Sequence, residues 1–443
     1  MPDQHVTRAL YQAVERGELP PEAINHRFAH HAMALCPTCR EEYRTYVEGR
    51  GTATASGHLT TVILLEAYRF LGDHLRELEE RARGEFLELL GLPAERRKER
   101  VTRATKRFRN PLLVEVLLEA SQARIFSQPQ EALRFARLAF HVALRSDVTL
   151  LGHDPAHELM LRALAAEANA LRVLGDLPRA DSAIAAALQK LDSVTDLESR
   201  AEIASLAASL RRDQRRFAEA LLLIDRSITL YAALSQHHQL ARCLILKANI
   251  LSEAGRLAEA IRIDQQALDR LDPAAEPRLY LCVQHNLTWH LEMCRAYADA
   301  RQRHDANRHL YAAFKDRWTQ LRRRWLEGKI AHGLGEWEEA ERALVEVRDG
   351  FIRRNHAYDA ALASLDLALL YADLGRTAEM QQLARQMMPI FRAQEVHREA
   401  LAALLVFWEA ASREAVTRGM VESLTSYLRK ARRDPSFRYE PTE

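Results

Sequence analysis

The sequence predicts an all-α protein in which pairs of helices stack into a solenoid, and three observations predict it. Ala, Leu, Arg and Glu dominate a chain of 443 residues that holds only 16 Gly and 14 Pro. Strand-like alternation of apolar and polar residues is hard to find, which argues against sheets. Six segments also align on one frame of 40 residues. A fixed period of this length is the signature of stacked helical repeats.

Composition limits the classes of function. The 48% of apolar residues can fill a core, and 443 residues correspond to two or three domains. A net charge of +2 gives no overall field that would attract nucleic acid. No apolar run reaches the roughly 18 to 20 residues of a membrane span, and the start, MPDQHVTRAL, lacks the features of a signal peptide. Five cysteines, two of them in a CxxC, fit reduced thiols, so we expect a cytoplasmic protein that binds no membrane.

The repeat frame is clearest at its turns. Segments such as LGDLPRADSA (174–183), AGRLAEAIRI (254–263) and LGEWEEAERA (334–343) share a turn residue that recurs every 40 positions. Gly occupies most of these turns, where a left-handed residue commonly closes a helix, and Arg replaces it twice at a cost of about 1 kcal/mol if that geometry is kept. The turn positions are Gly175, Arg215, Gly255, Arg295, Gly335 and Gly375.

Three further columns keep the same spacing. A small residue stands seven positions before each turn, where two helices would cross closely: Ala168, Ala208, Ala248, Thr288, Gly328 and Ala368. A large apolar residue stands two positions after five of the turns: Leu177, Phe217, Leu257, Tyr297 and Trp337. Alanine stands five positions after the same turns, and Met380 replaces it in the sixth unit: Ala180, Ala220, Ala260, Ala300 and Ala340.

These columns, in this order and spacing, resemble the tetratricopeptide repeat (TPR). The resemblance covers roughly residues 155–392, and it departs from that repeat in length, with 40 residues per unit instead of about 34. It implies a right-handed α-solenoid of about six to seven TPR-like helix pairs, with each helix about three residues longer than usual. The seventh, degenerate unit is expected at 114–144, where Gln130, Glu131 and Ala132 resemble the start of a second helix.

The rest of the chain divides around this solenoid. The segment EGRGTATASG is small, polar and Gly-rich, which is typical of a linker. The last ten residues, DPSFRYEPTE, are expected to be a frayed tail. The predicted segments are a small helical module at 1–47, the linker at 48–57, a helical connecting region at 58–110, the solenoid at 111–395, capping helices at 396–433 and the tail at 434–443.

The segment HAMALCPTC, residues 31–39, has the spacing of a metal site. The thiolates of Cys36 and Cys39 can chelate one tetrahedral Zn²⁺ ion, because the turn that Pro37 presets brings both sulfurs to the same side. His31 could supply the third ligand. A redox CxxC normally follows a strand, and none is expected here. We therefore predict a structural zinc site.

With this spacing, the segment resembles the zinc-binding anti-sigma module of bacteria, in which a His and a CxxC lie on a small helical N-terminal domain. The resemblance carries over to His31, Cys36 and Cys39, although this sequence has four residues between the His and the first Cys where that family has three. It implies a fourth ligand from the first helix. His5 is the first choice for that ligand, with the two histidines at 26 and 30 as alternatives.

The repeat frame also indicates a surface for a partner. In TPR arrays the first helix of each pair lines a concave groove through the positions 13, 10, 6 and 3 before the turn. Arg, Lys and Asn recur in these columns together with two Trp, which suits the backbone and carboxylates of a peptide. The alternative is that the longer helices bury the Trp residues against a neighbouring element. The predicted groove residues are Arg162, Asn169, Arg172, Arg212, Arg242, Asn249, His285, Trp289, Arg322, Trp325 and Lys329.

The sequence thus favours a bacterial, non-catalytic adaptor or regulator that binds a protein or peptide partner and carries Zn²⁺. No phosphate-binding loop, GxSxG or HExxH occurs, so we expect no enzyme. The alternative function is an anti-sigma-like transcription regulator with a redox-sensitive zinc site. For both functions the layout of zinc module and repeats resembles that of companions of sigma factors or of protease effectors, which are the expected partners. The basic segment ERRKERVTRATKRFRN, 95–110, is interpreted as a solvated helix face, with an acidic partner or nucleic acid as the alternative. The sequence predicts no oligomeric state.

Overall fold

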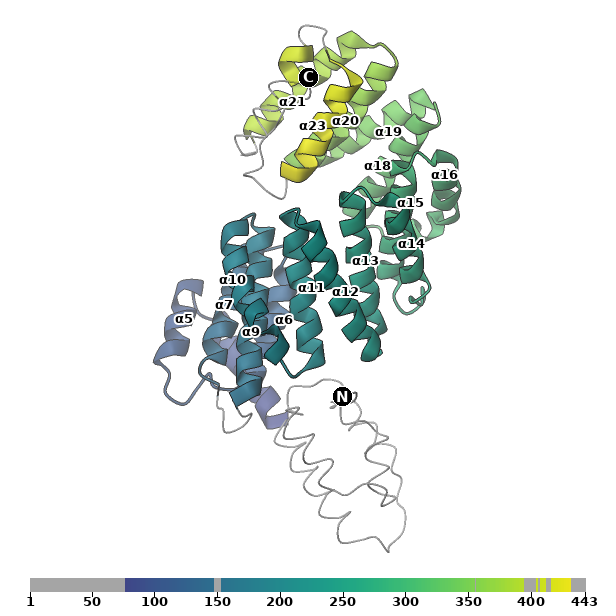
Figure 1. Cartoon of the computed structure of the whole chain (residues 1–443). Helices are drawn as coiled ribbons and strands as arrows, with labels where there is room; N and C mark the ends of the chain where they lie inside the picture. Colours follow the sequence, from purple (N-terminus) through teal and green to yellow (C-terminus); the bar gives the residue numbers. More distant parts are fainter. Residues whose placement is uncertain are drawn as a thin grey trace, which may run out of the picture. The chain divides into compact units, whose positions relative to one another are not determined.

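The structure is a computed structural model that describes residues 76–146, 153–354, 356–393, 404, 407–411 and 416–431. The chain divides into two compact units, Met1–Leu210 with Thr229–Ser235 and Arg211–Ile228 with Gln236–Glu443. Every regular element in these described ranges is a helix, which confirms the predicted all-α class (Figure 1). The predicted module at 1–47 and the linker at 48–57 lie outside the described residues.

The first unit consists of stacked antiparallel helices. Its elements after the helical residues 76–90 are α5 (Ala94–Arg103), α6 (Pro111–Arg124), α7 (Pro129–Ala143), α9 (His153–Val173), α10 (Leu177–Gln189), the short 3-10 helix η1 (Leu191–Ser193) and α11 (Leu197–Asp213), whose last three residues belong to the second unit. The helix α7 contacts α6 and α9, and α9 contacts α10 (Figure 1). The helices α6 and α7 cover most of the segment 114–144, in which the sequence predicts a degenerate repeat.

The second unit continues the same arrangement. Its elements are α12 (Phe217–Ala233), whose last five residues belong to the first unit, α13 (His237–Glu253), α14 (Leu257–Leu268), α15 (Pro277–Met293), α16 (Tyr297–Ala306), α17 (Arg308–Ala312), α18 (Arg317–Gly333), α19 (Trp337–Ile352), α20 (Ala357–Asp373), α21 (Thr377–Ala393) and α23 (Arg418–Ala431). The helix α14 contacts α13 and α15, and α19 contacts α18 and α20. Each of these second helices thus packs between the first helix of its own pair and that of the next pair, which is the packing of an α-solenoid.

The 40-residue period of the sequence is also the period of the helices. Five successive first helices are 17 residues long and begin 40 residues apart: α11, α13, α15, α18 and α20. The second helices all begin two positions after a turn residue but end at different points, since α14 has 12 residues and α19 has 16. The regular part of each unit is therefore the first helix with its turn, and the variation lies in the connection to the next unit.

All six predicted turn residues adopt the left-handed conformation. Their φ is between 66° and 82° at the four glycines and 60° at Arg215 and Arg295. In the first turn the Gly175 N–H donates to the Arg172 carbonyl at 3.0 Å and the Asp176 N–H donates to the Leu171 carbonyl at 3.0 Å, and the other five turns repeat both bonds. This pair of bonds is the Schellman motif, which satisfies the last carbonyls of the first helix and directs the chain into the second.

The column of small residues lies where the two helices of a pair cross. All six of its residues are buried, from α9 to α20. At Gly328 of α18, a Cβ atom would stand 3.0 Å from the Cβ of Ala343 and 3.1 Å from the side chain of Leu344, both on α19. Close contact between the helices therefore explains why this column excludes larger side chains.

The C-terminal helix α23 packs against α20, the first helix of the sixth 40-residue repeat. At its start, Nη1 of Arg418 donates to both carboxylate oxygens of Asp373 at the end of α20, at 2.5 and 2.7 Å. One buried cluster takes residues from both helices, including Leu362, Leu365, Val421, Leu424 and Leu428. The apolar positions of α20 that fall in the groove columns are consequently core residues.

Candidate partner-binding surface

The predicted groove residues lie on the first helices α9, α11, α13, α15 and α18, as the repeat frame requires. Their side chains differ in burial and in pairing. Some are bound to other groups of the same unit, two are buried in the core, and a few are exposed without a partner. Since a groove can bind only through groups that its own fold leaves free, these differences decide which residues form the candidate surface.

In the first unit the predicted cations are occupied. Arg162 donates to Glu115 of α6 and, from Nε at 2.9 Å, to Glu202 of α11. Burial lowers the pKa of Arg162, but the two carboxylates outweigh it and raise the pKa well above its ordinary value. Arg172 donates from Nη2 to the side-chain oxygen of Asn169 at 2.9 Å. These residues connect helices of the unit or one turn of α9, so they offer little free charge to a partner.

Two cations of the second unit are also paired. Arg212 lies 2.8 Å from Asp213 and 3.8 Å from Glu253. The Lys329 ammonium lies 3.1 Å from Glu292 and 3.8 Å from Asp366, and 5.2 Å from the ring centroid of Trp289. Lys329 thus joins α15, α18 and α20, and the half-buried ring of Trp289 covers one side of its charge.

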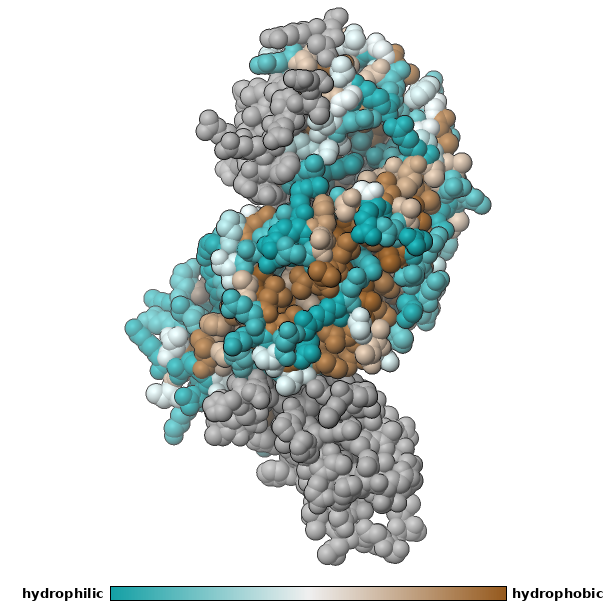
Figure 2. Space-filling model, in the orientation of Figure 1, coloured by the Kyte–Doolittle hydropathy of each residue, from teal (hydrophilic) through white to brown (hydrophobic). Residues whose placement is uncertain are grey.

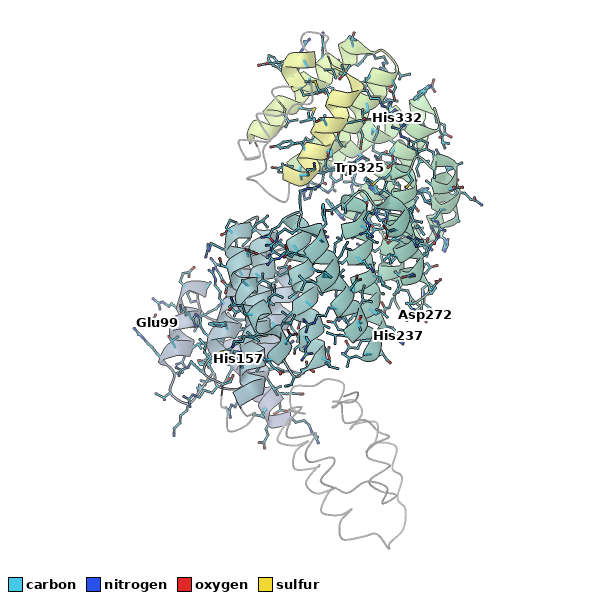
Figure 3. All side chains as sticks on the ribbon, viewed as in Figure 1. Glu99, His157, His237, Asp272, Trp325 and His332 are labelled. Carbon is cyan, nitrogen blue, oxygen red and sulfur yellow. The ribbon has the colours of Figure 1, made fainter. Side chains whose placement is uncertain are left out.

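The two residues His285 and Trp325 are not open to a partner, so the prediction that they line a groove is corrected. Trp325 is only 7% exposed and donates from its indole N–H to Asp366 at 2.7 Å (Figure 3). Its ring packs edge-on against Trp289 and Phe351, with centroids 5.7 and 5.5 Å away. The longer helices bring α20 over this ring, which is the alternative that the sequence left open.

His285 lies deeper in the same region. Its Nδ1 is 2.9 Å from the hydroxyl oxygen of Tyr311, a residue of the short helix α17. Burial, and to a lesser degree the charge of Arg322, lower the pKa of His285 well below its ordinary value. Burial likewise lowers the pKa of His304 on α16, whose ring centroid is 5.6 Å from that of Tyr311. These two histidines are therefore neutral core residues.

Four predicted groove residues remain at the surface of the second unit. Arg242 on α13 and Arg322 on α18 are exposed, and their side chains have no hydrogen bond or ion pair with any other described residue. Asn249 on α13 is half-buried and equally without a partner in the described part of the chain, and Trp289 is half-buried beside Lys329. These residues form the candidate surface: two free guanidinium groups, a free amide and an aromatic ring.

The sequence reasoning missed the acids that organise this region. Asp366 stands nine positions before its turn, outside the groove columns, yet it accepts from Trp325 and faces Lys329. Glu292 falls in a column but was not selected, and it is 8% exposed. A search for acids 37 and 41 residues from a groove cation or indole would have found both, because first helices that stand one unit apart lie side by side.

The basic segment 95–110 is partly bound to its own unit. Arg100 donates to Glu88 at 2.9 Å, Arg107 also pairs with Glu88, and Arg97 pairs with Glu131. The ring of Phe108 is fully buried, and the guanidinium carbons of Arg100 and Arg107 each lie 5.4 Å from its centroid. Outward-pointing side chains such as that of Glu99 lie at the edge of the unit (Figure 3).

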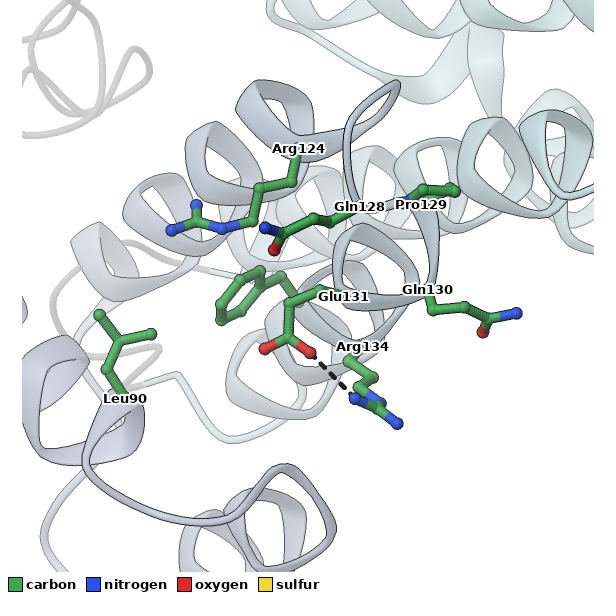
Figure 4. A pocket seen from close by; sticks show the side chains of 8 residues that line it. Leu90, Arg124, Gln128, Pro129, Gln130, Glu131 and Arg134 are labelled. Atoms are coloured by element: carbon green, nitrogen blue, oxygen red, sulfur yellow. Dashed lines mark hydrogen bonds and ion pairs between the residues drawn. The ribbon is translucent and has the colours of Figure 1, made fainter. Parts of the chain in front are cut away.

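An open cavity of about 510 Å³ lies beside this segment (Figure 4). Its lining combines a buried aromatic ring with charged and amide side chains. Glu131 accepts from Arg134 at 3.1 Å, and the guanidinium carbon of Arg124 lies 5.2 Å from the ring centroid of Phe135. The lining residues are Leu90, Arg124, Gln128, Pro129, Gln130, Glu131, Arg134 and Phe135.

The predicted zinc ligands His5, His31, Cys36 and Cys39 lie outside the described residues. Within the described ranges, no group of three or more His, Cys, Asp and Glu side chains could hold a metal ion. The three cysteines of the described residues, Cys243, Cys282 and Cys294, are free thiols. No described helix combines the length and the apolar character that crossing a membrane requires.

Hydropathy supports a surface of mixed character. In the view of Figure 2, hydrophobic residues gather around α12 and hydrophilic residues border them. The α12 side chain of Leu222 is 73% exposed, and those of Leu334 and Trp337 around the α18–α19 turn are 39% and 41% exposed. Of the exposed side chains, Leu222 stands on α12 while Leu334 and Trp337 stand at another place in the fold, and single exposed apolar side chains are normal on folded proteins.

Comparison with known proteins places the fold. No protein-family model and no curated protein matches the chain. A solved Rap protein complexed with Competence and Sporulation Factor is 12% identical, with a TM-score of 0.52 over 73% of this chain and 92% of that chain. Aspartyl phosphate phosphatase F from Bacillus subtilis is also 12% identical, with a TM-score of 0.45 over 89% and 93%. The Rap conjugation gene regulator of plasmid pLS20 with the Phr* peptide is 12% identical, with a TM-score of 0.40 over 71% and 97%. At these identities the similarity concerns the fold alone, and the chain is a TPR-like helical-repeat protein.

Proposed function

We propose that the protein is a non-catalytic adaptor or regulator that binds a peptide or an extended protein segment on the first helices of the second unit. The observation that carries the proposal is the set of free polar groups on two first helices of the second unit, α13 and α18. Arg242, Asn249 and Arg322 have no partner among the described residues, whereas the other predicted cations of the groove are paired. Free amide and guanidinium groups in a row suit a peptide backbone and its side chains.

The similarity of fold agrees with this function. The solved Rap protein with the TM-score of 0.52 is itself complexed with a factor, the Competence and Sporulation Factor. A helical-repeat chain of this fold can therefore serve as a binding scaffold, and helical-repeat solenoids present extended surfaces for such use. The residues that would bind a partner here are argued from this chain alone.

Site-specific photo-crosslinking in the native host tests the proposal. A photoreactive amino acid replaces Asn249 in the full chain, and a matched variant carries it at the exposed Glu338 on the second helix α19. We expect a protein or peptide that crosslinks at position 249 and not at position 338. A partner that crosslinks at 338 and not at 249, or no adduct at 249, would exclude this surface as the binding site.

We also propose that the N-terminal segment binds structural Zn²⁺ through His31, Cys36 and Cys39, with His5 as the fourth ligand. The support is the donor set, since two thiolates with imidazoles are ligands that tetrahedral Zn²⁺ prefers. When bound, the ion would replace the core that so short a segment cannot build alone. The finer alternative is an anti-sigma-like regulator that releases a sigma factor when its thiols are oxidised and zinc is lost. A pull-down that recovers a sigma factor only under reducing conditions would favour that alternative.

A further inference from the structure

The cations of the predicted groove differ in whether acidic side chains pair with them. Arg162, Arg212 and Lys329 each bind two acids of their own unit. Arg242 and Arg322 bind none within the described part of the chain, and both are exposed. The fold therefore neutralises the cations that tie helices together and leaves these two guanidinium groups available.

The two free arginines are in register. Each stands 13 positions before its turn, Arg242 on α13 and Arg322 on α18, and Cys282 holds the same position on α15 between them. The first helices contact one another, α13 with α15 and α15 with α18. Packed helices lie about 8 to 10 Å apart, so the backbones of the two arginines are about 16 to 20 Å apart. Cys282, the residue that stands between the two arginines in this row, has a small and exposed side chain. No large or charged side chain of the row therefore separates them.

This spacing corresponds to a short stretch of extended chain. An extended peptide advances about 3.3 Å per residue, so about five to six residues span a distance equal to that between the backbones of the two arginines. A guanidinium group binds a carboxylate with two parallel hydrogen bonds, which makes Arg the specific side chain for Asp and Glu of a partner. About two turns further along the helices, Asn249 on α13 and Trp289 on α15 offer an amide and an aromatic ring to the peptide backbone.

Resting on the proposed function, we propose that the groove of the second unit selects an extended peptide with two carboxylates about five to six residues apart. Arg242 binds one carboxylate and Arg322 the other. The partner is accordingly an acidic segment. Its two carboxylates form the ion pairs that Arg242 and Arg322 do not form with other described residues.

A display library of random 12-residue peptides, selected on the purified full chain, tests this inference. Synthetic peptides from the selection are then titrated, by fluorescence anisotropy, into the wild type and into the variants Arg242→Gln, Arg322→Gln and Arg322→Lys. The matched control is Arg262→Gln on the second helix α14, since that side chain is 70% exposed and its nearest acid is 3.9 Å away. Both Gln variants lose one positive charge, as the control does.

We expect the selected peptides to carry Asp or Glu in pairs with the stated spacing. Each Gln variant in the groove should bind them about tenfold more weakly, Arg322→Lys should recover part of the loss, and Arg262→Gln should bind as the wild type does. Peptides without paired acids, or equal binding by the wild type and both groove variants, would overturn the acidic specificity and leave the proposed function in place. A selection that enriches no peptide over a surface without protein would count against both.

Discussion

The ring of Tyr297, the first residue of α16, lies directly on the backbone of Gly333 at the end of α18. A Cβ atom at Gly333 would stand 2.2 Å from two ring carbons of Tyr297, far inside the closest approach of real carbon atoms. Tyr297 belongs to the apolar column two positions after each turn, and Gly333 stands two positions before the next turn. Tyr297 thus packs the start of α16 onto the end of α18, the first helix of the following repeat.

This contact makes Gly333→Ala destabilising. A methyl group in this place must displace the tyrosine ring, and overpacking of this kind costs about 1 to 3 kcal/mol, which exceeds the roughly 1 kcal/mol that Ala otherwise gains over Gly in a helix. Urea denaturation followed by circular dichroism measures the loss. The control is Gly84→Ala, where a Cβ would meet nothing within 4 Å and the variant should be slightly stabilised. If Tyr297→Leu failed to relieve Gly333→Ala, the ring would not be the cause.

The two arginine turns give a second prediction of opposite sign. Arg295 holds a φ of 60°, a conformation that costs a non-glycine residue about 1 to 2 kcal/mol, so Arg295→Gly should stabilise the protein by up to about 1 kcal/mol. Gly255→Ala, in the turn of the preceding unit with a φ of 81°, should destabilise it by a similar amount. Thermal unfolding of both variants against the wild type checks the signs. A stabilised Gly255→Ala would show that the turn does not require the left-handed conformation.

The turns also show why so much of this fold could be predicted from the sequence. A turn residue, a small residue and an apolar residue at fixed offsets describe contacts between elements that are close along the chain. The first two recur six times and the third five times. Repetition separates these positions from chance, because a residue required by packing recurs every 40 positions and a surface residue does not. The start of α13, α15, α18 and α20 at 40-residue intervals follows from the same columns.

The candidate surface was less predictable, for a reason that Trp325 illustrates. Trp325 does stand on a first helix, as its groove column predicts. Its exposure, however, depends on Asp366, which accepts the indole N–H, and on α20, which covers the ring. Pairing and coverage arise between units and differ from one unit to the next, so no repeated pattern reports them. Arg162 and Arg242 hold the same groove position, 13 residues before their turns. Arg162 is paired and Arg242 has no partner among the described residues, and only the structure distinguishes them.

The indole of Trp325 provides a third prediction. Trp325→Phe keeps most of the buried ring but removes the N–H that donates to Asp366 at 2.7 Å, which leaves a carboxylate at 4% exposure with one donor fewer. A buried acceptor without its donor costs about 1 to 3 kcal/mol, and we expect this loss in urea denaturation. Asp366→Asn with Trp325→Phe should cost less than the sum of the two single variants, because the two changes disrupt the same bond. Additive costs would contradict the coupling.

Buried histidines give the protein a pH dependence. Burial lowers the pKa of His285 and of His304 below 6.5 in the folded state, so at lower pH the unfolded chain binds more protons than the folded chain. Stability is therefore complete above about pH 6.5 and falls as the pH decreases below it, by at most about 1.4 kcal/mol per pH unit for each histidine. Unfolding free energies at pH 7.5, 6.5 and 5.5 measure this slope. His285→Gln and His304→Gln should each flatten it, and an unchanged slope in both variants would assign the effect to other groups.

The metal is tested by its stoichiometry. Protein purified without chelator should contain about one equivalent of zinc by elemental analysis, and Cys36→Ser or Cys39→Ser should lose it. Cys294→Ser serves as the control, because Cys294 is a free, exposed thiol. Less than roughly half an equivalent would exclude the site.

The fourth ligand can be separated from its alternatives in the same assay. His5→Ala should weaken zinc retention against a competing chelator by about 10- to 100-fold, the loss that removal of one coordinating or supporting group typically causes, whereas His26→Ala and His30→Ala should retain the ion. If His26→Ala or His30→Ala released zinc instead, that residue would be the ligand.

The partner assay with the zinc-free protein distinguishes two uses of the metal. Because Arg242 and Arg322 stand on α13 and α18, more than 200 residues from the cysteines in sequence, a purely structural zinc should leave peptide affinity at these arginines unchanged. A regulatory zinc should change it.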